Sequence, residues 1–272
     1  MIFSFEQDWK KYTEVNNTIV ESIDYGIGKV LIVNDFLKYP DKLLDLCKKL
    51  SFYTSSTKDI IRPGKSFPLY PDYLNNYGIN IGNFLSKTLG CFDVNFSDII
   101  VNCFNGDMKT WYEYPHTDVV DFDTSKSNSH IAGNIGLTPE NKSGTGFWSF
   151  NDKISILDMN VSEFYDYKNF FSSVVYENTS ANQPKKWRQI INEGPWKLEF
   201  ICPLEYNSYV LYSSTNFHSL YMNPEWYIDK DRISIATFID VTPNDINHSE
   251  FNDFHKQIWN NLKLDTIFNQ QF

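Results

Sequence analysis

The chain has 272 residues, a formal net charge of −10, a hydrophobic content of 42% and an aromatic content of 17%. This content supports a sizeable core and excludes a largely disordered chain. The negative charge argues against a surface that binds phosphate backbones nonspecifically, so a nucleic-acid partner is not expected.

Cysteine spacing and the pattern of apolar runs bear on the cellular compartment. The four cysteines form no CxxC pair, which favours buried free thiols over a disulfide framework or a structural zinc site; they are Cys47, Cys91, Cys103 and Cys202. No apolar run approaches about 18 residues, and the opening MIFSFEQDWKKY lacks the apolar stretch of a signal peptide. We therefore expect a soluble, cytoplasmic protein without a membrane partner, and the sequence does not indicate its oligomeric state.

The first 95 residues alternate between strand and helix signals. Residues 28–35 (GKVLIVND) are predicted as a strand. Residues 40–51 are predicted as a helix, because their leucines fall on one face and Pro40 lies in the first turn. Residues 77–89 are predicted as a second helix, which ends at Gly90.

From residue 97 to residue 242 the sequence consists mainly of short β-rich runs separated by Gly, Pro, Asn and Ser. The predicted strands are 98–104, 131–137, 145–150, 198–202, 207–213 and 232–240. This pattern predicts an antiparallel sandwich or barrel. An insertion at 160–197 interrupts it, with a predicted helix at 184–193, and a last helix is predicted at 249–262. Because no repeat or low-complexity linker occurs, we expect a single domain.

The segment His116-Thr117-Asp118 is a candidate metal site. In an extended segment, residues i and i+2 lie on the same side, so an imidazole and a carboxylate can converge on one ion. A third ligand must come from elsewhere; the candidates are His130, His218, His248 and His255. His218 stands out because it lies in a turn, STNFHS, directly after the predicted strand 207–213.

Two histidines and one carboxylate on one face of an octahedral ion form the facial triad of non-haem Fe(II) oxygenases, which leaves three positions open. The same donor set is also compatible with catalytic zinc. Fourteen residues after His218, Arg232 and Ser234 open an apolar strand as Arg-x-Ser. A guanidinium binds a carboxylate bidentately, and a nearby hydroxyl adds a hydrogen bond. The alternative for Arg232 is an ion pair with Asp229, Asp231 or Asp240.

Together these residues resemble the Fe(II)/2-oxoglutarate-dependent oxygenases, on the prolyl-hydroxylase-like side of that family. The resemblance covers roughly residues 98–242, and it rests on four segments in the same order as in the family: YPHTD at 114–118, IAGNIGLTPENKSGTGFW at 131–148, NSYVLYSSTNFHSL at 207–220 and DRISIATFI at 231–239. It implies a mainly β fold with flanking helices (α+β), in which a double-stranded β-helix of jelly-roll or cupin type is supported by helices.

The resemblance also implies an organisation for the chain. A single oxygenase domain would span residues 1–272, with N-terminal helical support over about 1–95. The jelly-roll core would cover about 96–242, including the insertion at 160–197, and a C-terminal helix would cover 247–264.

The resemblance implies a set of cofactors and roles. Fe(II) would be held by His116, Asp118 and His218, and 2-oxoglutarate would be anchored by Arg232 and Ser234. With O2, 2-oxoglutarate would be decarboxylated to succinate while the substrate is hydroxylated; the family's halogenases leave the carboxylate position open, and here Asp118 fills it.

A further cosubstrate contact follows more loosely from the resemblance. Asn102 matches the Asn of an Asn-x-Tyr motif that contacts 2-oxoglutarate in the nucleic-acid demethylase branch. Here Phe104 replaces the Tyr, and the interval to His116 is longer. Alternative hydroxyl donors are Tyr112, Tyr114 and Tyr212.

The expected substrate is a peptide or protein side chain, or an amino-acid-like small molecule. Three loops would line the mouth of the site in this fold: 51–76, 119–130 and 160–197. They are rich in Tyr, Phe, Asp and Ser. A nucleic-acid oxygenase is the alternative among enzymes, disfavoured by net charge, and a non-catalytic jelly-roll metal-binding module is the alternative from another class.

Overall fold

The computed structural model has four helices among the residues that it describes, which are 2–16, 20–24, 29–52, 65–89, 93–104, 115–118, 131–140, 142–180, 194–222, 224–227 and 230–242. The helices are α1 (Ile2–Tyr12), α2 (Pro40–Cys47), α3 (Leu74–Leu89) and α4 (Val161–Ser180). Short 3-10 turns cover Pro71–Tyr73, Ile156–Asp158 and Pro224–Tyr227.

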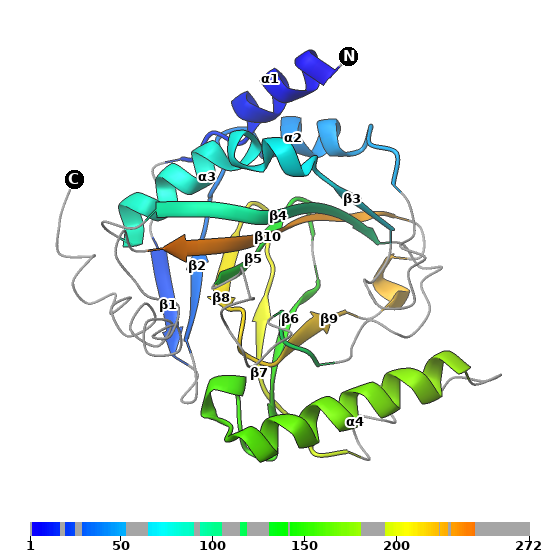
Figure 1. The fold of residues 1–272 in the computed structure, drawn as a ribbon. Coiled ribbons are helices and arrows are strands. Elements are labelled where there is room, and N and C mark those ends of the chain that lie inside the picture. Colours follow the sequence, from blue (N-terminus) through cyan, green and yellow to red (C-terminus); the bar gives the residue numbers. More distant parts are fainter. Residues whose placement is uncertain are drawn as a thin grey trace.

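The described strands form two antiparallel sheets (Figure 1). The strands are β1 (Val20–Asp24), β2 (Lys29–Val33), β3 (Lys65–Pro68), β4 (Asp93–Phe104), β5 (Ile131–Gly136), β6 (Gly144–Phe150), β7 (Trp196–Pro203), β8 (Tyr209–Ser213), β9 (His218–Tyr221) and β10 (Arg232–Thr242). The large sheet has the order β1-β2-β8-β5-β10-β4-β3, and the small sheet has the order β7-β6-β9.

The path of the chain between these sheets identifies the fold. After β4 in the large sheet, the chain passes to His116, which pairs with His218 beside the small sheet. It then returns to β5, crosses to β6 and β7, returns to β8, crosses to β9 and ends in β10. This alternation winds two sheets from one chain, as in a double-stranded β-helix of the jelly-roll class. The predicted fold class is therefore confirmed.

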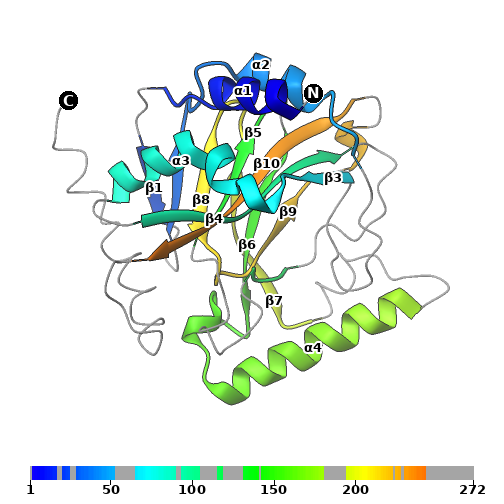
Figure 2. The same cartoon turned by 45° about the horizontal axis from the view of Figure 1, so that its top comes forward.

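The helices lie on the outer faces of the two sheets, as Figures 1 and 2 show from two directions. Helices α1, α2 and α3 cover the large sheet, and their buried side chains share one apolar cluster with the strands beneath them. Within β10, Ile233 and Ile235 belong to this cluster. Because side chains alternate along a strand, Arg232 and Ser234 face the other way, into the space between the sheets.

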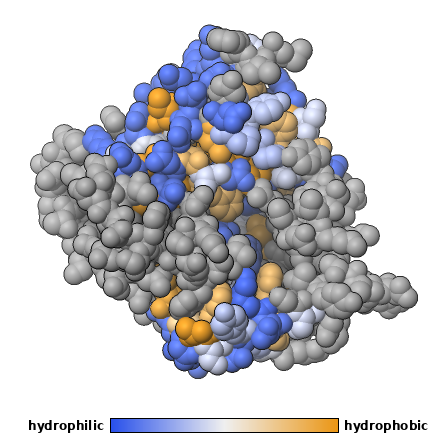
Figure 3. Space-filling model, in the orientation of Figure 1, coloured by the Kyte–Doolittle hydropathy of each residue, from blue (hydrophilic) through white to orange (hydrophobic). Residues whose placement is uncertain are grey.

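Helix α4 covers the outer face of the small sheet (Figure 1). Its Phe164 and Tyr167 pack in a second apolar cluster with residues of β6 and β7 and with Phe217. The outward side of α4 exposes Val161 and Tyr165. On the side of the molecule seen in Figure 3, hydrophilic and hydrophobic residues are mixed over the described surface. The two largest apolar clusters lie between the helices and the sheets that they cover.

Within β6, Gly144 makes close packing of the small sheet possible. A Cβ atom at this position would lie 2.2 Å from the carbonyl oxygen of Cys202 in the neighbouring strand β7. A side chain there would therefore push the two strands apart.

The predicted elements of the β region match the observed strands closely, and β2, α2 and α3 match the N-terminal predictions within a few residues. Helix α1, the strands β1, β3 and β9, and the helix α4 in the insertion were not predicted from the sequence. The predicted helices at 184–193 and 249–262, the latter part of the expected 247–264 segment, lie outside the described residues, as do loop 119–130 and residues 53–64 of loop 51–76.

Three cysteines are free and buried, as predicted: Cys47, Cys103 and Cys202. Burial raises the pKa of the Cys103 thiol to about 11, so this thiol stays protonated and poorly nucleophilic at neutral pH. Cys91 lies outside the described residues. No described helix is long and apolar enough to cross a membrane.

Candidate metal centre

The predicted metal-binding pair and the distal histidine come together at the β9 side of the small sheet. His116 and His218 exchange two backbone hydrogen bonds of 2.9 Å, and the amide of Asp118 donates to the carbonyl of Ser214 at 3.0 Å. These bonds fix the extended segment 115–118 alongside the turn and the strand that carry His218. The predicted convergence of residues i and i+2 is observed.

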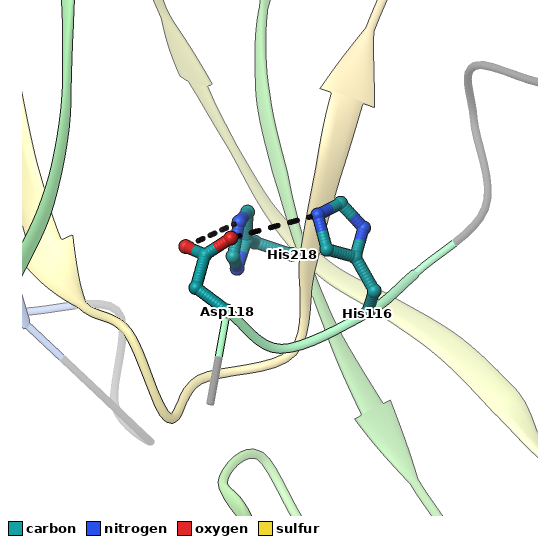
Figure 4. A group of neighbouring side chains, drawn as sticks. All are labelled: His116, Asp118 and His218. Carbon is teal, nitrogen blue, oxygen red and sulfur yellow. Dashed lines mark ion pairs between the residues drawn. The ribbon is translucent and has the colours of Figure 1, made fainter. Parts of the chain in front are cut away.

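The side chains of His116, Asp118 and His218 point toward one another (Figure 4). Nε2 of His218 lies 3.2 Å from Oδ2 of Asp118, and Nε2 of His116 lies 3.9 Å from Oδ1 of Asp118. One donor atom from each residue lies within 4.8 Å of the others. Ligand bonds of about 2.1 Å would place such atoms within about 4.2 Å of each other, so a small inward movement would close the set around one ion.

Hydrogen bonding and charge prepare His218 for a cation. Its Nδ1 donates to the carbonyl of Asn216 at 2.9 Å, so Nε2 faces Asp118. Burial alone would lower the pKa of His218, but the charge of Asp118 and the hydrogen bonds to Asp118 and Asn216 raise it. A carboxylate that stabilises a proton on a buried imidazole also favours a metal ion in its place.

The three residues differ in exposure, which gives the site an orientation. The side chains of His218 and Asp118 are 5% and 10% exposed, whereas that of His116 is 41% exposed. The site is therefore closed on the His218 side and accessible on the His116 side.

Tyr212 and Asn134 extend the site into the space between the sheets. The ring of Tyr212 lies 4.7 Å from the ring of His218, and its hydroxyl accepts a hydrogen bond of 3.1 Å from Nδ2 of Asn134. Burial, followed by the charge of Asp118, raises the pKa of Tyr212 well above its ordinary value. Asn134 was not singled out from the sequence, although its place on the inner face of strand 131–137 follows from the alternation of that strand.

Arg232 is buried at the start of β10, with only 2% of its surface exposed. Its Nε donates to Oγ of Ser143, its Nη1 donates to Oγ of Ser234 at 3.1 Å, and its guanidinium lies 5.0 Å from the ring centre of Phe104. Burial lowers its pKa to about 10, so it remains a cation at neutral pH. Ser143 was not predicted as a partner of Arg232, because the two residues lie far apart along the chain.

No carboxylate of the described residues forms an ion pair with Arg232. Of the three aspartates considered as partners from the sequence, Asp231 and Asp240 make no such pair, and Asp229 lies outside the described residues. A buried cation whose partners here are hydroxyls and an aromatic ring is suited to an anionic ligand.

Neighbouring strand positions connect Arg232 with the three candidate ligands. Ser234 pairs in register with Gly136 of β5, two residues from Asn134, and Asn134 contacts Tyr212 beside His218. On the other side, Ser234 pairs with Asn102 of β4. The structure thus brings Asn102 beside Ser234, while Tyr112 and Tyr114 lie outside the described residues.

No family model matches the sequence, and no curated protein matches it either. Solved structures that resemble this chain include 2-oxoglutarate/Fe(II) oxygenases. An oxidoreductase of the 2OG-Fe(II) oxygenase family from Burkholderia pseudomallei is 9% identical, with a TM-score of 0.43 over 78% of this chain and 84% of that one. The viral collagen prolyl hydroxylase of Paramecium Bursaria Chlorella virus-1 is 13% identical, with a TM-score of 0.42 over 78% and 88%. HygX from Streptomyces hygroscopicus, solved with nickel, 2-oxoglutarate and hygromycin B, is 8% identical, with a TM-score of 0.46 over 82% and 86%. Likeness at this level identifies no function.

Proposed function

We propose that this chain is a single-domain Fe(II)- and 2-oxoglutarate-dependent oxygenase that hydroxylates its substrate. The observation that carries the proposal is the pairing of two features on the inner faces of the two sheets. One is a set of two imidazoles and one carboxylate within 4.8 Å of one another. The other is the buried guanidinium of Arg232, which has hydroxyl partners but no carboxylate partner among the described residues.

The donor set fits Fe(II). His116, Asp118 and His218 supply the 2-His-1-carboxylate combination that leaves three positions open on an octahedral ion. The hydrogen bond from Nδ1 of His218 to the carbonyl of Asn216 holds its ring in the orientation that a ligand needs. When bound, Fe(II) with 2-oxoglutarate and O2 would supply the oxidising chemistry, and the protein would supply binding, orientation and exclusion of water.

Arg232 fits the far carboxylate of 2-oxoglutarate. A guanidinium offers two parallel donors to a carboxylate, and its interaction is strong where water is excluded. Ser143 and Ser234 hold the guanidinium in place, and Phe104 covers its face. Asn102 lies in register with Ser234 and is proposed as a further polar contact to the cosubstrate. A zinc hydrolase would have no need of this buried cation.

A peptide or protein side chain, or an amino-acid-like small molecule, is the substrate class that we propose. It would approach from the side on which His116 is exposed. The net charge of −10 supports this choice over a nucleic acid, whose backbone would be repelled by such a surface.

Anaerobic spectroscopy tests the proposal directly. Wild-type protein mixed with Fe(II) and 2-oxoglutarate should show the weak visible charge-transfer band of the chelate, and admission of air should release succinate slowly. Asp118→Ala should lose both signals, because it removes a ligand. Asp45→Ala is a matched control, since Asp45 is exposed on α2, away from the site, and this variant should behave as wild type.

Two results would contradict the proposal in different ways. If wild-type protein gave neither band nor succinate, a non-catalytic metal-binding module would be the better description. If succinate formation survived in Asp118→Ala, the assignment of the ligands would be wrong.

A further inference from the structure

Tyr167 is a buried tyrosine of α4 that reaches the candidate metal centre from outside the small sheet. It is 4% exposed, and it belongs to the apolar cluster that attaches α4 to β6 and β7. This cluster alone accounts for an aromatic ring at position 167. It does not account for a hydroxyl group, which costs free energy to bury unless it has a partner.

The partner of the hydroxyl is Thr117, the residue between two of the candidate ligands. Burial raises the pKa of the Tyr167 hydroxyl to about 12, and hydrogen bonding from the side chain and the backbone of Thr117 partly offsets this rise. Backbone amides alternate between the two edges of an extended segment. The amides of His116 and Asp118 donate toward His218 and Ser214, so the amide of Thr117 faces the opposite edge, where Tyr167 lies.

The ring of Tyr167 touches the other strand of the site. It lies 4.9 Å from the ring of Phe217, at an interplanar angle of 64°. Phe217 is fully buried and directly precedes His218. Along this strand too, neighbouring side chains face opposite ways, so His218 turns inward to Asp118 while Phe217 turns outward to α4.

We propose that Tyr167 is a positioning residue of the metal centre, which fixes the 116–118 segment relative to the strand of His218 by holding Thr117 with its hydroxyl and Phe217 with its ring. The inference rests on the proposed metal site. It gives the insertion helix α4 a role in setting the distance between ligands, in addition to covering the sheet. The backbone hydrogen bonds to His218 and Ser214 lie on one side of the 116–118 segment, and Tyr167 would support the segment on the other side.

The test compares two buried tyrosines that each share a hydrogen bond with a threonine. Tyr167→Phe removes the hydroxyl that binds Thr117 and keeps the ring. Tyr209→Phe is the matched control, because the Tyr209 hydroxyl bonds Thr237 at 2.7 Å on the helix-covered side of the large sheet, away from the metal centre. Both are measured as metal-free protein titrated with Co(II), whose d–d absorption reports ligand geometry as well as affinity.

We expect Tyr167→Phe to bind Co(II) about ten-fold more weakly than wild type, the lower end of what loss of an outer-shell partner costs. Its d–d spectrum should shift, while its thermal midpoint without metal should fall no further than that of Tyr209→Phe. The control should bind Co(II) with wild-type affinity and spectrum. A general loss of stability would instead move both variants alike.

A double-mutant cycle with Thr117→Val sharpens the result. If the Tyr167 hydroxyl acts through Thr117, the double variant should lose less Co(II) affinity than the sum of the two single losses. Equal affinity and an unchanged spectrum in Tyr167→Phe would overturn the inference and leave the proposed function standing. Failure of wild-type protein to bind Co(II) would instead overturn the proposed metal site itself, and the inference with it.

Discussion

At the start of β10, both faces of the strand are buried and they have opposite chemistry. On the outer face, Ile233 and Ile235 are 1% and 0% exposed and pack in the cluster under the helices. On the inner face, Arg232 and Ser234 are each 2% exposed and face the space between the sheets. Buried apolar groups stabilise a fold, whereas a buried cation costs free energy until an anion pairs with it. One strand therefore supports stability on one side and, under the proposed function, would bind the cosubstrate on the other.

The largest effect on stability is expected on the outer face. Ile235→Ala should lower the free energy of unfolding by about 2–5 kcal/mol, because it removes buried methyl groups and leaves a cavity. Denaturant unfolding of wild type and variant measures this difference. At a temperature where both are folded, the KM for 2-oxoglutarate should not change. A raised KM in this variant would show that the two faces are not independent.

Arg232→Met should show the opposite pattern. The variant loses the charge-assisted bonds proposed for 2-oxoglutarate, each worth about 1.5–3 kcal/mol, so its KM for 2-oxoglutarate should rise by about ten-fold or more. Its free energy of unfolding without ligand should stay equal or rise, since an apolar side chain of similar length avoids the desolvation of a buried charge. Steady-state succinate assays and denaturant unfolding separate the two effects.

Arg232→Lys provides the control for charge alone. It retains a cation but loses the planar fork, so its KM for 2-oxoglutarate should lie between those of wild type and Arg232→Met. A marked loss of stability in Arg232→Met would mean that Arg232 is a structural residue, and the contrast between the two faces would fail.

The same contrast explains how much the sequence could predict. The convergence of His116 and Asp118 follows from the two-residue period of an extended segment, and the long β runs follow from their apolar and β-branched residues. The strand of His218 was not predicted, because β9 is short and begins with a candidate ligand in place of an apolar residue. Its pairing with His116 depends on a contact across about a hundred residues, which no local pattern encodes.

Helix α4 and the partners of the site were missed for related reasons. The aromatic residues of α4 that pack on the small sheet are interspersed with Asp, Glu, Lys, Ser and Asn, and Val161 and Tyr165 lie exposed, so the apolar stripe is weak in the sequence. Tyr167 therefore has no sequence signal that separates it from a packing residue. Likewise, no local pattern marks Ser143, which is identified only by its hydrogen bond with Arg232 in the folded chain. Residues that orient other residues are set by tertiary contacts, and local periodicity carries no information about those.

The smallest effect is expected from Ser143→Ala, which changes the support of Arg232 and leaves its charge intact. Loss of one hydrogen bond of about 0.5–1.5 kcal/mol should raise the KM for 2-oxoglutarate only a few-fold, because Ser234 still holds Nη1 of the guanidinium at 3.1 Å. Succinate assays over a range of 2-oxoglutarate concentrations measure the change. Thr237→Val, a change of similar size on the outer face of β10, should leave this KM as in wild type. If Ser143→Ala raised the KM for 2-oxoglutarate as much as Arg232→Met does, the charge of the guanidinium alone would not be sufficient for binding. The position of the guanidinium, which Ser143 helps to fix, would then govern binding of the cosubstrate.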